Sequence, residues 1–329
     1  MISRSAPAAT ITVGPGENIQ AAIDKASPGD IIEVKSGNYK ECIEITKSLT
    51  LIGIDSGEGI PVIDGRFVDS TVHLAADRCQ LMGFKLLNSQ GHGVSVNSNF
   101  CSITNNTIEA CSAGIFLREA NSNVISHNDA RISCQGLISL LRGDAVQLMD
   151  SNNNIIKGNN ATGAFIGIYL FHSHNNTVVE NHAQGNDHGI SLLGSGGNTV
   201  RGNNPINNAQ DGIGFLDDCV NNIISENTAT GNAIGILLQD SSNNIVYLND
   251  FINNEQNAKS TRSQNRWHSP EPMNYSSRDK SITSYLGNYW SDYNGSDSDG
   301  NGIGDDPYKF NGDQDDHPLM KRGIDFLKA

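Results

Sequence analysis

The sequence has little of what builds a thick globular core or a membrane anchor. Aromatic residues make up 6% of its 329 residues, whereas Gly and Asn are abundant. The opening segment, MISRSAPAAT, lacks the apolar stretch of about 7 to 15 residues that a signal peptide needs, and no transmembrane segment follows it. We therefore expect a thin core, no membrane insertion and no leader in the sequence as given.

Positive charge is also scarce. The 22 Lys and Arg residues are outnumbered by 36 Asp and Glu residues, which gives a formal net charge of −14. No cluster of Lys and Arg supplies the positive surface that nucleic acid or an anionic membrane requires. Neither partner is expected, and a polyanionic ligand would need a bridging cation.

The cysteines show no CxxC spacing, so a zinc site is not expected. The six are Cys42, Cys79, Cys101, Cys111, Cys134 and Cys219. Cys79 and Cys101 are 22 residues apart, and we expect them to stack as small apolar groups. A disulfide between them is the less favoured alternative.

A repeat dominates the middle of the chain. Its clearest copies begin at Gly167 (GIYLFHSHNNTVVEN), Gly189 (GISLLGSGGNTVRGN), Gly212 (GIGFLDDCVNNIISEN) and Gly235 (GILLQDSSNNIVYLN), in steps of 22, 23 and 23 residues. A fixed period of this size indicates stacked units. Each copy holds two short runs of alternating apolar residues separated by turn residues, which predicts strands. A leucine-rich repeat is disfavoured because no copy contains a helical pattern.

Asparagine recurs at two positions of the repeat. One column is Asn105, Asn128, Asn159, Asn181, Asn203, Asn227 and Asn249; the other is Asn123, Asn154, Asn176, Asn198, Asn222 and Asn244. Stacked about 4.8 Å apart, such side chains can hydrogen-bond along the stack, so we interpret them as structural ladders. We expect the column between them to point inward: Cys79, Cys101, Val124, Ile155, Thr177, Thr199, Ile223 and Ile245. The whole predicts an all-β, right-handed parallel β-helix.

The ends differ from the repeat. Residues 1–54 are predicted to form an N-terminal cap and the first coils, with a short amphipathic helix over Ile19 to Ala26 as the lid. Residues 55–257 hold the repeats. Residues 258–329 are predicted to form an irregular C-terminal cap with an Asp-rich loop.

Three segments together resemble a known family. The opening VGPGENIQAAIDKASPGDIIEV, the Asn-laddered coils and the tail LGNYWSDYNGSDSDGNGIGDDPY are similar to the NosD-type, or CASH-domain, β-helix proteins, which have a pectin-lyase-like fold. The resemblance implies an exported protein that is periplasmic, extracellular or attached to the cell surface. Some members of this group bind or process polysaccharides, and the namesake assists copper-site maturation.

Copper itself is disfavoured by the residues. A soft Cu(I) site gathers Met, Cys and His, but the five Met residues are dispersed. The nearest His pair, His172 and His174, lies in an expected turn where both side chains can be solvated.

Calcium is better supported. Oxygen donors fall at loop positions 1, 3, 5, 7 and 9, supplied by Asp297, Asp299, Asn301, the Ile303 carbonyl and Asp305. Gly302 occupies position 6, where the loop must turn sharply. Position 12 is Tyr308 instead of Glu, so a further ligand is expected from Asp306, Asp313 or Asp315. A solvated acidic turn is the alternative.

The resemblance also suggests where a sugar would bind. Enzymes of this fold place carboxylates, His, Tyr or Arg on outward positions of successive coils. The corresponding candidates for acid/base chemistry are Asp150, His172 and Asp217, and those for sugar binding are Phe116, Arg118, Glu119, Tyr169, Phe171 and Asp240. The competing interpretation is ordinary turn chemistry, since Asp, Asn, His and Ser favour turns.

One step of the repeat is longer than the rest. Gly114 and Ala145 are 31 residues apart, and the apolar segment from Cys134 to Leu141 is expected to bulge beside Asp150 and His172. We expect a protein that binds extended carbohydrate along its flank. The alternatives are a polysaccharide lyase, hydrolase or epimerase, and a non-catalytic scaffold, with a surface protein as partner, or an accessory protein for copper-site maturation.

Overall fold

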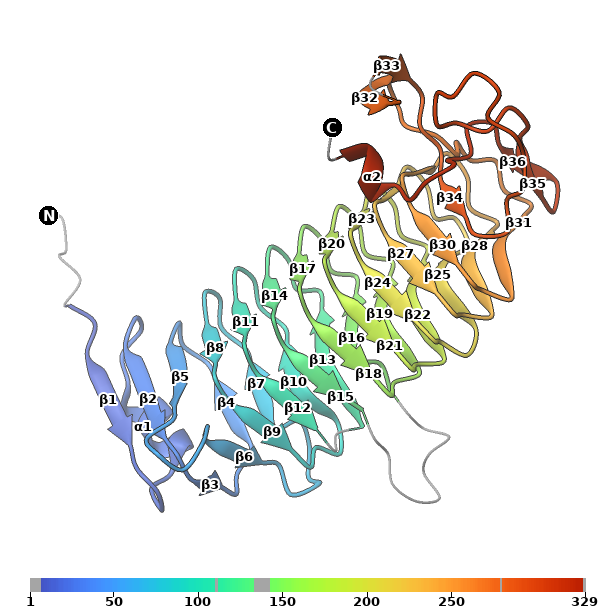
Figure 1. Ribbon diagram of the computed structural model, residues 1–329. Helices are drawn as coiled ribbons and strands as arrows, with labels where there is room; N and C mark the ends of the chain where they lie inside the picture. The colour runs from blue at the N-terminus through green and yellow to red at the C-terminus, as the bar shows by residue number, and fades with distance from the viewer. Residues whose placement is uncertain (1–6, 110–111, 133–142, 279, 328–329) are drawn as a thin grey trace, which may run out of the picture.

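The computed structural model describes residues 7–109, 112–132, 143–278 and 280–327, and shows a rod built from three parallel sheets (Figure 1). The chain visits the three sheets in turn on each coil, so every strand pairs with the strand one coil before and after it. The predicted right-handed parallel β-helix is confirmed. We call the sheets A, B and C.

Sheet A is formed by β1 (Thr10–Val13), β2 (Ile31–Lys35), β5 (Thr50–Ile54), β8 (Gln80–Met82), β11 (Ser102–Thr104), β14 (Val124–Ser126), β17 (Ile155–Lys157), β20 (Thr177–Val179), β23 (Thr199–Arg201), β26 (Ile223–Ser225) and β29 (Ile245–Tyr247). Sheet B is formed by β3 (Asn38–Tyr39), β6 (Val62–Asp64), β9 (Lys85–Leu87), β12 (Thr107–Glu109), β15 (Asp129–Arg131), β18 (Asn160–Thr162), β21 (His182–Gln184), β24 (Asn204–Ile206), β27 (Thr228–Thr230), β30 (Asp250–Ile252) and β34 (Tyr289–Trp290).

Sheet C has the longest strands. It is formed by β4 (Ile43–Ile45), β7 (Val72–Leu74), β10 (His92–Val96), β13 (Ala113–Arg118), β16 (Val146–Met149), β19 (Ile166–Phe171), β22 (His188–Leu193), β25 (Asp211–Leu216), β28 (Ile234–Gln239) and β31 (Gln256–Thr261).

The core is a set of inward rows of aliphatic side chains, one above another. The inward row of sheet A is fully buried and consists of Leu81, Ile103, Ile125, Ile156, Val178, Val200, Ile224 and Val246. From Val124 onward, the row predicted to face inward instead faces outward, and Ile155 and Ile223 in it are 42% and 37% exposed, whereas Cys79 and Cys101 are buried. Because Ser102 pairs with Val124, Cys101 lies opposite Asn123 and belongs to the Asn row. The prediction was wrong because a shift of one residue along a strand moves every side chain to the other face.

Both Asn ladders are present, with one correction. Thr107 pairs with Asp129, so the residue stacked under Asn128 is Asn106 and not Asn105. Asn105 adopts a left-handed conformation, with φ 55°, in the preceding turn. In each ladder the backbone N–H and the side-chain Nδ2 of one Asn both donate to Oδ1 of the next, as from Asn181 to Asn203 at 2.9 and 3.0 Å.

A third ladder was not foreseen. It consists of Asn186, Asn208, Asn232 and Asn254 and has the same hydrogen-bond pattern. Its signal in the sequence is an Asn three or four positions before the small residue of each copy. That small residue is required by packing, because a Cβ on Gly167 or Gly189 would lie 2.6 or 2.4 Å from the carbonyl oxygen of the next coil.

The N-terminal end carries the short helix expected from the sequence, α1 (Ile19–Lys25). Asn18 caps it by accepting a hydrogen bond from the Ala21 N–H at 2.6 Å. The helix buries Ile19 and Ile23 and contacts β1, β2 and β4.

The C-terminal end is held by contacts that occur once each. The remaining elements are β32 (Met273–Ser277), β33 (Lys280–Ser284), β35 (Tyr308–Phe310), β36 (Asp313–Asp315) and α2 (Ile324–Leu327). The first Asn ladder runs past Asn249 to Asn288 and ends on Asp315. Asp315 is fully buried and accepts from the Asn288 N–H at 2.8 Å and from Trp290 Nε1 at 3.0 Å. Burial raises the pKa of Asp315 to about 7.

Four of the cysteines lie in the described residues, and all four are free thiols: Cys42, Cys79, Cys101 and Cys219. Cys79 and Cys101 are buried, so their expected stacking in the interior is confirmed without a disulfide. The segment from Cys134 to Leu141, predicted to bulge from the rod, lies outside the described residues. Within the described part of the chain, no helix has the length and apolar character needed to cross a bilayer.

Candidate functional site

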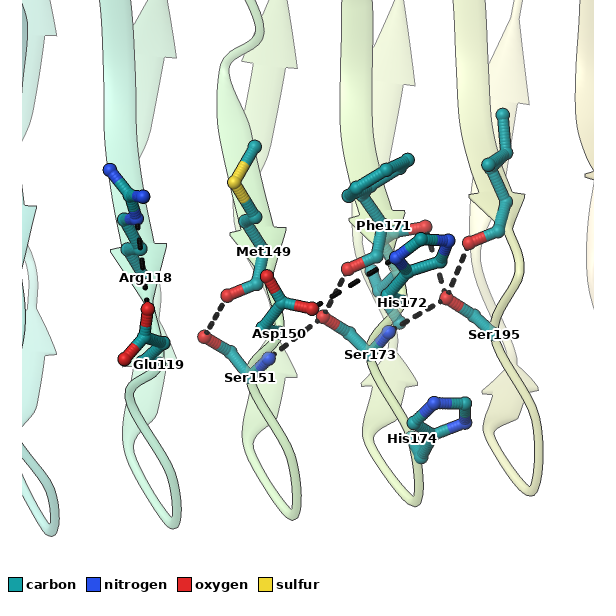
Figure 2. Close-up of polar contacts among 12 residues, drawn as sticks. Arg118, Glu119, Met149, Asp150, Ser151, Phe171, His172, Ser173, His174 and Ser195 are labelled. Carbon is teal, nitrogen blue, oxygen red and sulfur yellow. Dashed lines mark hydrogen bonds and ion pairs between the residues drawn. The ribbon is translucent and has the colours of Figure 1, made fainter.

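The predicted acid/base pair lies in the turn that follows sheet C. Glu119, Asp150 and His172 occupy this turn on successive coils, as Figure 2 shows. His172 Nδ1 lies 4.0 Å from Asp150 Oδ1, and about half of each side chain is exposed. Both residues have positive φ, 51° for Asp150 and 44° for His172, which Asp and His tolerate in turns. Turn geometry therefore accounts for their residue types, and at 4.0 Å the two side chains are close but not hydrogen-bonded.

A row of serines fixes this turn. The Ser151 N–H donates to Ser173 Oγ at 3.0 Å, and the Ser173 N–H donates to Ser195 Oγ at 2.9 Å (Figure 2). Each serine is buried, so the backbone that carries Asp150 and His172 is held on both sides.

Asp217 and Asp240 are not brought to the pair. Gly194 occupies the coil between His172 and Asp217, and a Cβ on Gly194 would lie 2.4 Å from the His172 ring. Asp240 instead forms a two-point ion pair with Arg262, in which both N···O distances are 2.6 Å. The Arg262 guanidinium lowers the pKa of Asp240.

The predicted sugar-binding aromatics are divided between two places. Phe116 and Tyr169 lie in one outward row of sheet C, two coils apart with Gln147 between them. Phe171 lies at the strand end, where its ring stacks on His172 with 4.0 Å between centroids. Arg118 and Glu119 lie beside this group, 4.0 Å apart and exposed. We define the sheet C face by its outward row: Phe116, Gln147, Tyr169, Ser191, Gly214 and Leu237.

The sequence analysis missed a second polar group on this face. His188 Nδ1 lies 2.6 Å from Asp211 Oδ2, and the Asp211 side chain is only 4% exposed. The hydrogen bond that His188 donates to Asp211 raises the pKa of His188. Asp144, at the same strand position two coils before His188, accepts from the Ile166 N–H at 3.1 Å, and burial raises its pKa to about 7.

A signal for this group exists in the sequence. The residue just before the small residue of the repeat is titratable in four copies, as His92, Asp144, His188 and Asp211. A buried strand start normally carries an apolar or small residue, such as Ile166 in the same row. Comparing this position across copies would have identified the group.

The acidic loop does not gather its carboxylates. Asp305 Oδ2 accepts from Ser298 Oγ at 2.6 Å and from the Ser298 N–H at 2.9 Å, and these hydrogen bonds lower the pKa of Asp305. Asp299 Oδ2 accepts from Asn301 Nδ2 at 3.0 Å. Of the further ligands considered, Asp313 accepts from Trp267 Nε1 and Asp315 ends the Asn ladder. One feature fits a cation: Asp297 Oδ1 is buried and has no hydrogen-bond partner in the described structure.

Donors for copper are also dispersed. Cys79 and Cys101 are buried, His172 stacks on Phe171, and His174 Nδ1 accepts from the Gly196 N–H at 3.0 Å. Among the residues that the structure describes, no group of three or more His, Cys, Asp or Glu side chains converges. These residues do not fit the soft donor set that copper prefers.

The three-sheet rod with its ladders defines the class: the chain is a parallel β-helix protein of the pectin-lyase-like kind. The sequence profile of the NosD family, described as periplasmic copper-binding protein (NosD), matches residues 130–295, about half of the chain. The chain therefore belongs to the NosD family, and the resemblance seen in the sequence is confirmed.

One curated relative is a cell surface glycoprotein of Methanothermus fervidus, 37% identical over 94 residues. The match spans 28% of this chain and only 15% of that relative. The A-module of mannuronan C-5 epimerase AlgE4 from Azotobacter vinelandii has a similar structure, with a TM-score of 0.53 and 15% identity over 77% of this chain and 93% of that one. The GH136 lacto-N-biosidase of Eubacterium ramulus has a TM-score of 0.52 and 9% identity, covering 78% and 68%. Both structures share the fold.

Proposed function

We propose that this protein binds an extended carbohydrate along the sheet C face. The observation that carries the proposal is the arrangement of this face, where aromatic and hydrogen-bonding side chains alternate over four successive coils, as Phe116, Gln147, Tyr169 and Ser191. Phe116 and Tyr169 are partly exposed, Phe165 is 46% exposed, and His188 lies among them. Aromatic rings offer flat surfaces to sugar rings, and a few placed polar groups fix the orientation of a ligand.

The shape of the rod suits a polymer better than a small compact ligand. Strands of one sheet repeat about every 4.8 Å along the rod, so the same outward positions recur in a line. The described strands of sheet C run from β4 to β31 (Figure 1). An extended chain lying along this line would meet several coils at once.

An exported location is part of the proposal. The family is described as periplasmic, and the curated relative is a cell surface glycoprotein.

A second candidate function is catalysis on the bound polymer. The observation that favours it is the 4.0 Å approach of Asp150 and His172, which is compatible with acid/base work. Asp217 does not join them, so the pair would act without it. A scaffold that contacts another surface protein is the outcome left if neither binding nor chemistry is detected.

The acidic loop is proposed to hold a structural calcium ion. The loop order of Asp297, Asp299, Asn301, Ile303 and Asp305 supports it, as does the unpartnered Asp297 Oδ1. Binding requires Asp305 to exchange its serine partners for the ion, so we expect the affinity to be weak.

The test combines a glycan array with an assay for unsaturated uronate or reducing-end product. We expect binding that is lost in Tyr169→Ala and kept in Phe100→Ala. Phe100 is the control because it is an aromatic residue outside the sheet C face, 56% exposed and next to Arg78, and is thus more exposed than the partly buried Tyr169. Product release abolished by His172→Ala would establish catalysis. Binding to no glycan on the array would overturn the carbohydrate proposal.

A further inference from the structure

The His188 and Asp211 pair is built more firmly than any other polar group on the sheet C face. The two residues open β22 and β25 on adjacent coils, two positions before the paired Ile190 and Ile213. Their 2.6 Å contact is short, and the carboxylate is buried whereas the His188 side chain keeps 26% of its surface exposed. The imidazole is therefore the part of the pair that a ligand can reach.

The burial of the Asp211 side chain destabilises the fold. Among the described residues its side chain accepts a hydrogen bond only from His188, and its Oδ1 is buried without a partner. A buried carboxylate with an unsatisfied oxygen destabilises a fold. Its one evident effect is on His188: a carboxylate at Nδ1 holds a proton there, which leaves Nε2 as the nitrogen that faces a ligand.

The outward side chains beside His188 are small. Next to it in the outward row are Ser191, which is 3% exposed, and Gly214, which has no side chain. A Cβ on Gly214 would lie 2.6 Å from Asp211 Oδ1 and 3.5 Å from Ser191 Oγ. The larger side chains of the row, Tyr169 and Leu237, lie on either side of Ser191 and Gly214.

Aromatic side chains lie next to Ser191 and His188. Phe165 meets the His188 ring edge-on, with 5.5 Å between centroids. Tyr169 is partly exposed one coil before Ser191. A ring-shaped ligand over Ser191 and Gly214 would therefore have an aromatic surface within reach of its apolar face.

The charge of this region selects among sugars. The five consecutive strands β16, β19, β22, β25 and β28 contain no Lys or Arg, whereas Asp144 and Asp211 lie at their starts. A polyuronate would bring one carboxylate per residue to these five coils, where no sheet C strand offers a fixed cation; Lys259 follows Leu237 in the outward row, one coil beyond them. A neutral sugar carries no such penalty.

We propose that His188 is the polar anchor of a subsite for a neutral pyranose, with Nε2 hydrogen-bonded to a sugar hydroxyl and the apolar face of the ring on Tyr169. Asp211 is a positioning residue that fixes the proton on Nδ1. A hydroxyl both donates and accepts, so it pairs with Nε2 whether the imidazole is neutral or charged. This subsite rests on the proposed carbohydrate function and names its ligand class.

The test measures binding of neutral hexamers, such as glucan, mannan, galactan and xylan, against mannuronate and galacturonate hexamers by titration calorimetry. We expect a neutral hexamer to bind and the uronates to bind at least about tenfold more weakly. His188→Ala should weaken binding of the neutral hexamer by about tenfold or more, since a buried ligand hydrogen bond is lost. His182→Ala is the matched control, because His182 lies on the neighbouring coil of sheet B and bonds only to Gln184 among the described residues.

NMR of the histidine ring signals shows whether the bound hexamer contacts His188. The bound hexamer should shift the His188 ring signals and not those of His182, and Asp211→Asn should lower the pKa of His188 measured in the same way. Neutral binding that is unaffected by His188→Ala, or a preference for uronates, overturns the subsite but leaves the carbohydrate function standing. Binding of none of the hexamers and none of the array glycans overturns both.

Discussion

The middle coils and the C-terminal end of the rod are stabilised in opposite ways. In the middle, each coil repeats the same Asn and aliphatic contacts as its neighbours, as with Asn181 and Asn203. At the end, contacts occur once: Trp290 stacks between Phe251 and Tyr308, with centroid distances of 4.6 and 4.5 Å, and Asp315 replaces the next Asn. A repeated contact leaves a periodic trace in the sequence, whereas a single contact does not.

The largest expected effect comes from a charge in the repeated core. Ile168→Asp should prevent folding, because Ile168 is fully buried and an unpaired buried charge costs several kcal/mol, on the order of 5. Thr177→Asp, in the outward row of sheet A, should change stability by no more than about 0.5 kcal/mol. Circular dichroism and thermal melting compare the two. Ser191 is not a suitable control although it points outward, since it is only 3% exposed. Equal damage from both variants would refute the inward and outward assignment.

The next largest effect is expected for substitutions in the first Asn ladder, which show whether that ladder continues into the C-terminal end of the rod. Asn203→Leu should destabilise by about 1 to 3 kcal/mol, since the amides of Asn181 lose their acceptor. Asn249→Leu should cost the same, because Asn249 bonds to Asn288 and is not the terminal rung that its place in the repeat suggests. Asn204→Leu is the control, next in sequence but in an outward position. A clearly smaller loss at Asn249, measured by chemical denaturation, would show that the end does not support the ladder.

The pH dependence of stability, measured in variants, distinguishes a buried carboxyl at the C-terminal end from one on the sheet C face. Asp315 and Asp144 both have pKa values raised to about 7 by burial, above the unfolded value near 4. Each carboxyl therefore contributes stability that is fully present below about pH 4 and lost as the pH rises through 7. Between pH 5 and 6 the free energy of unfolding should fall by up to about 1.4 kcal/mol per pH unit for each group. Asp315→Asn and Asp144→Asn should each flatten the curve, and an unchanged slope in both would contradict these assignments.

The smallest effect concerns the acidic loop. Millimolar Ca²⁺ added to chelator-treated protein should stabilise it by about 1 kcal/mol, given an affinity in the range of about 10⁻⁴ to 10⁻³ M. Asp297→Ala combined with Asp299→Ala should abolish the response without changing the β-helix spectrum. Melting curves and proteolysis of residues 258–329 provide the measurement. No response at several millimolar Ca²⁺ would reduce the loop to a hydrogen-bonded acidic turn.

The extent to which the sequence predicted the molecule follows the same division. Periodicity was sufficient for the fold, for two of the three Asn ladders and for the placement of Asp150 and His172 on adjacent coils. It failed where alignment shifted by one residue, as at Asn105 and Cys101, because the side-chain period of a strand is two.

The site was harder to predict than the fold. The contact between His188 and Asp211 depends on which titratable residue each of two adjacent copies carries at the position just before its small residue, and periodicity predicts only what the copies share. The end was harder still, since the partners of Asp315 lie 25 and 27 residues away along the chain with no repeat to align them.

The direction of the Asn ladders has a consequence for the length of the protein. Within the first Asn ladder each Asn donates to the rung on its C-terminal side and accepts from the rung on its N-terminal side, from Asn106 to Asn288, and the last acceptor is the Asp315 carboxylate, which has no amide of its own to satisfy. Adding or deleting one whole coil therefore leaves every donor and acceptor matched at both termini. Duplication of a 22-residue unit can lengthen the rod in single-coil increments without any change to the two ends.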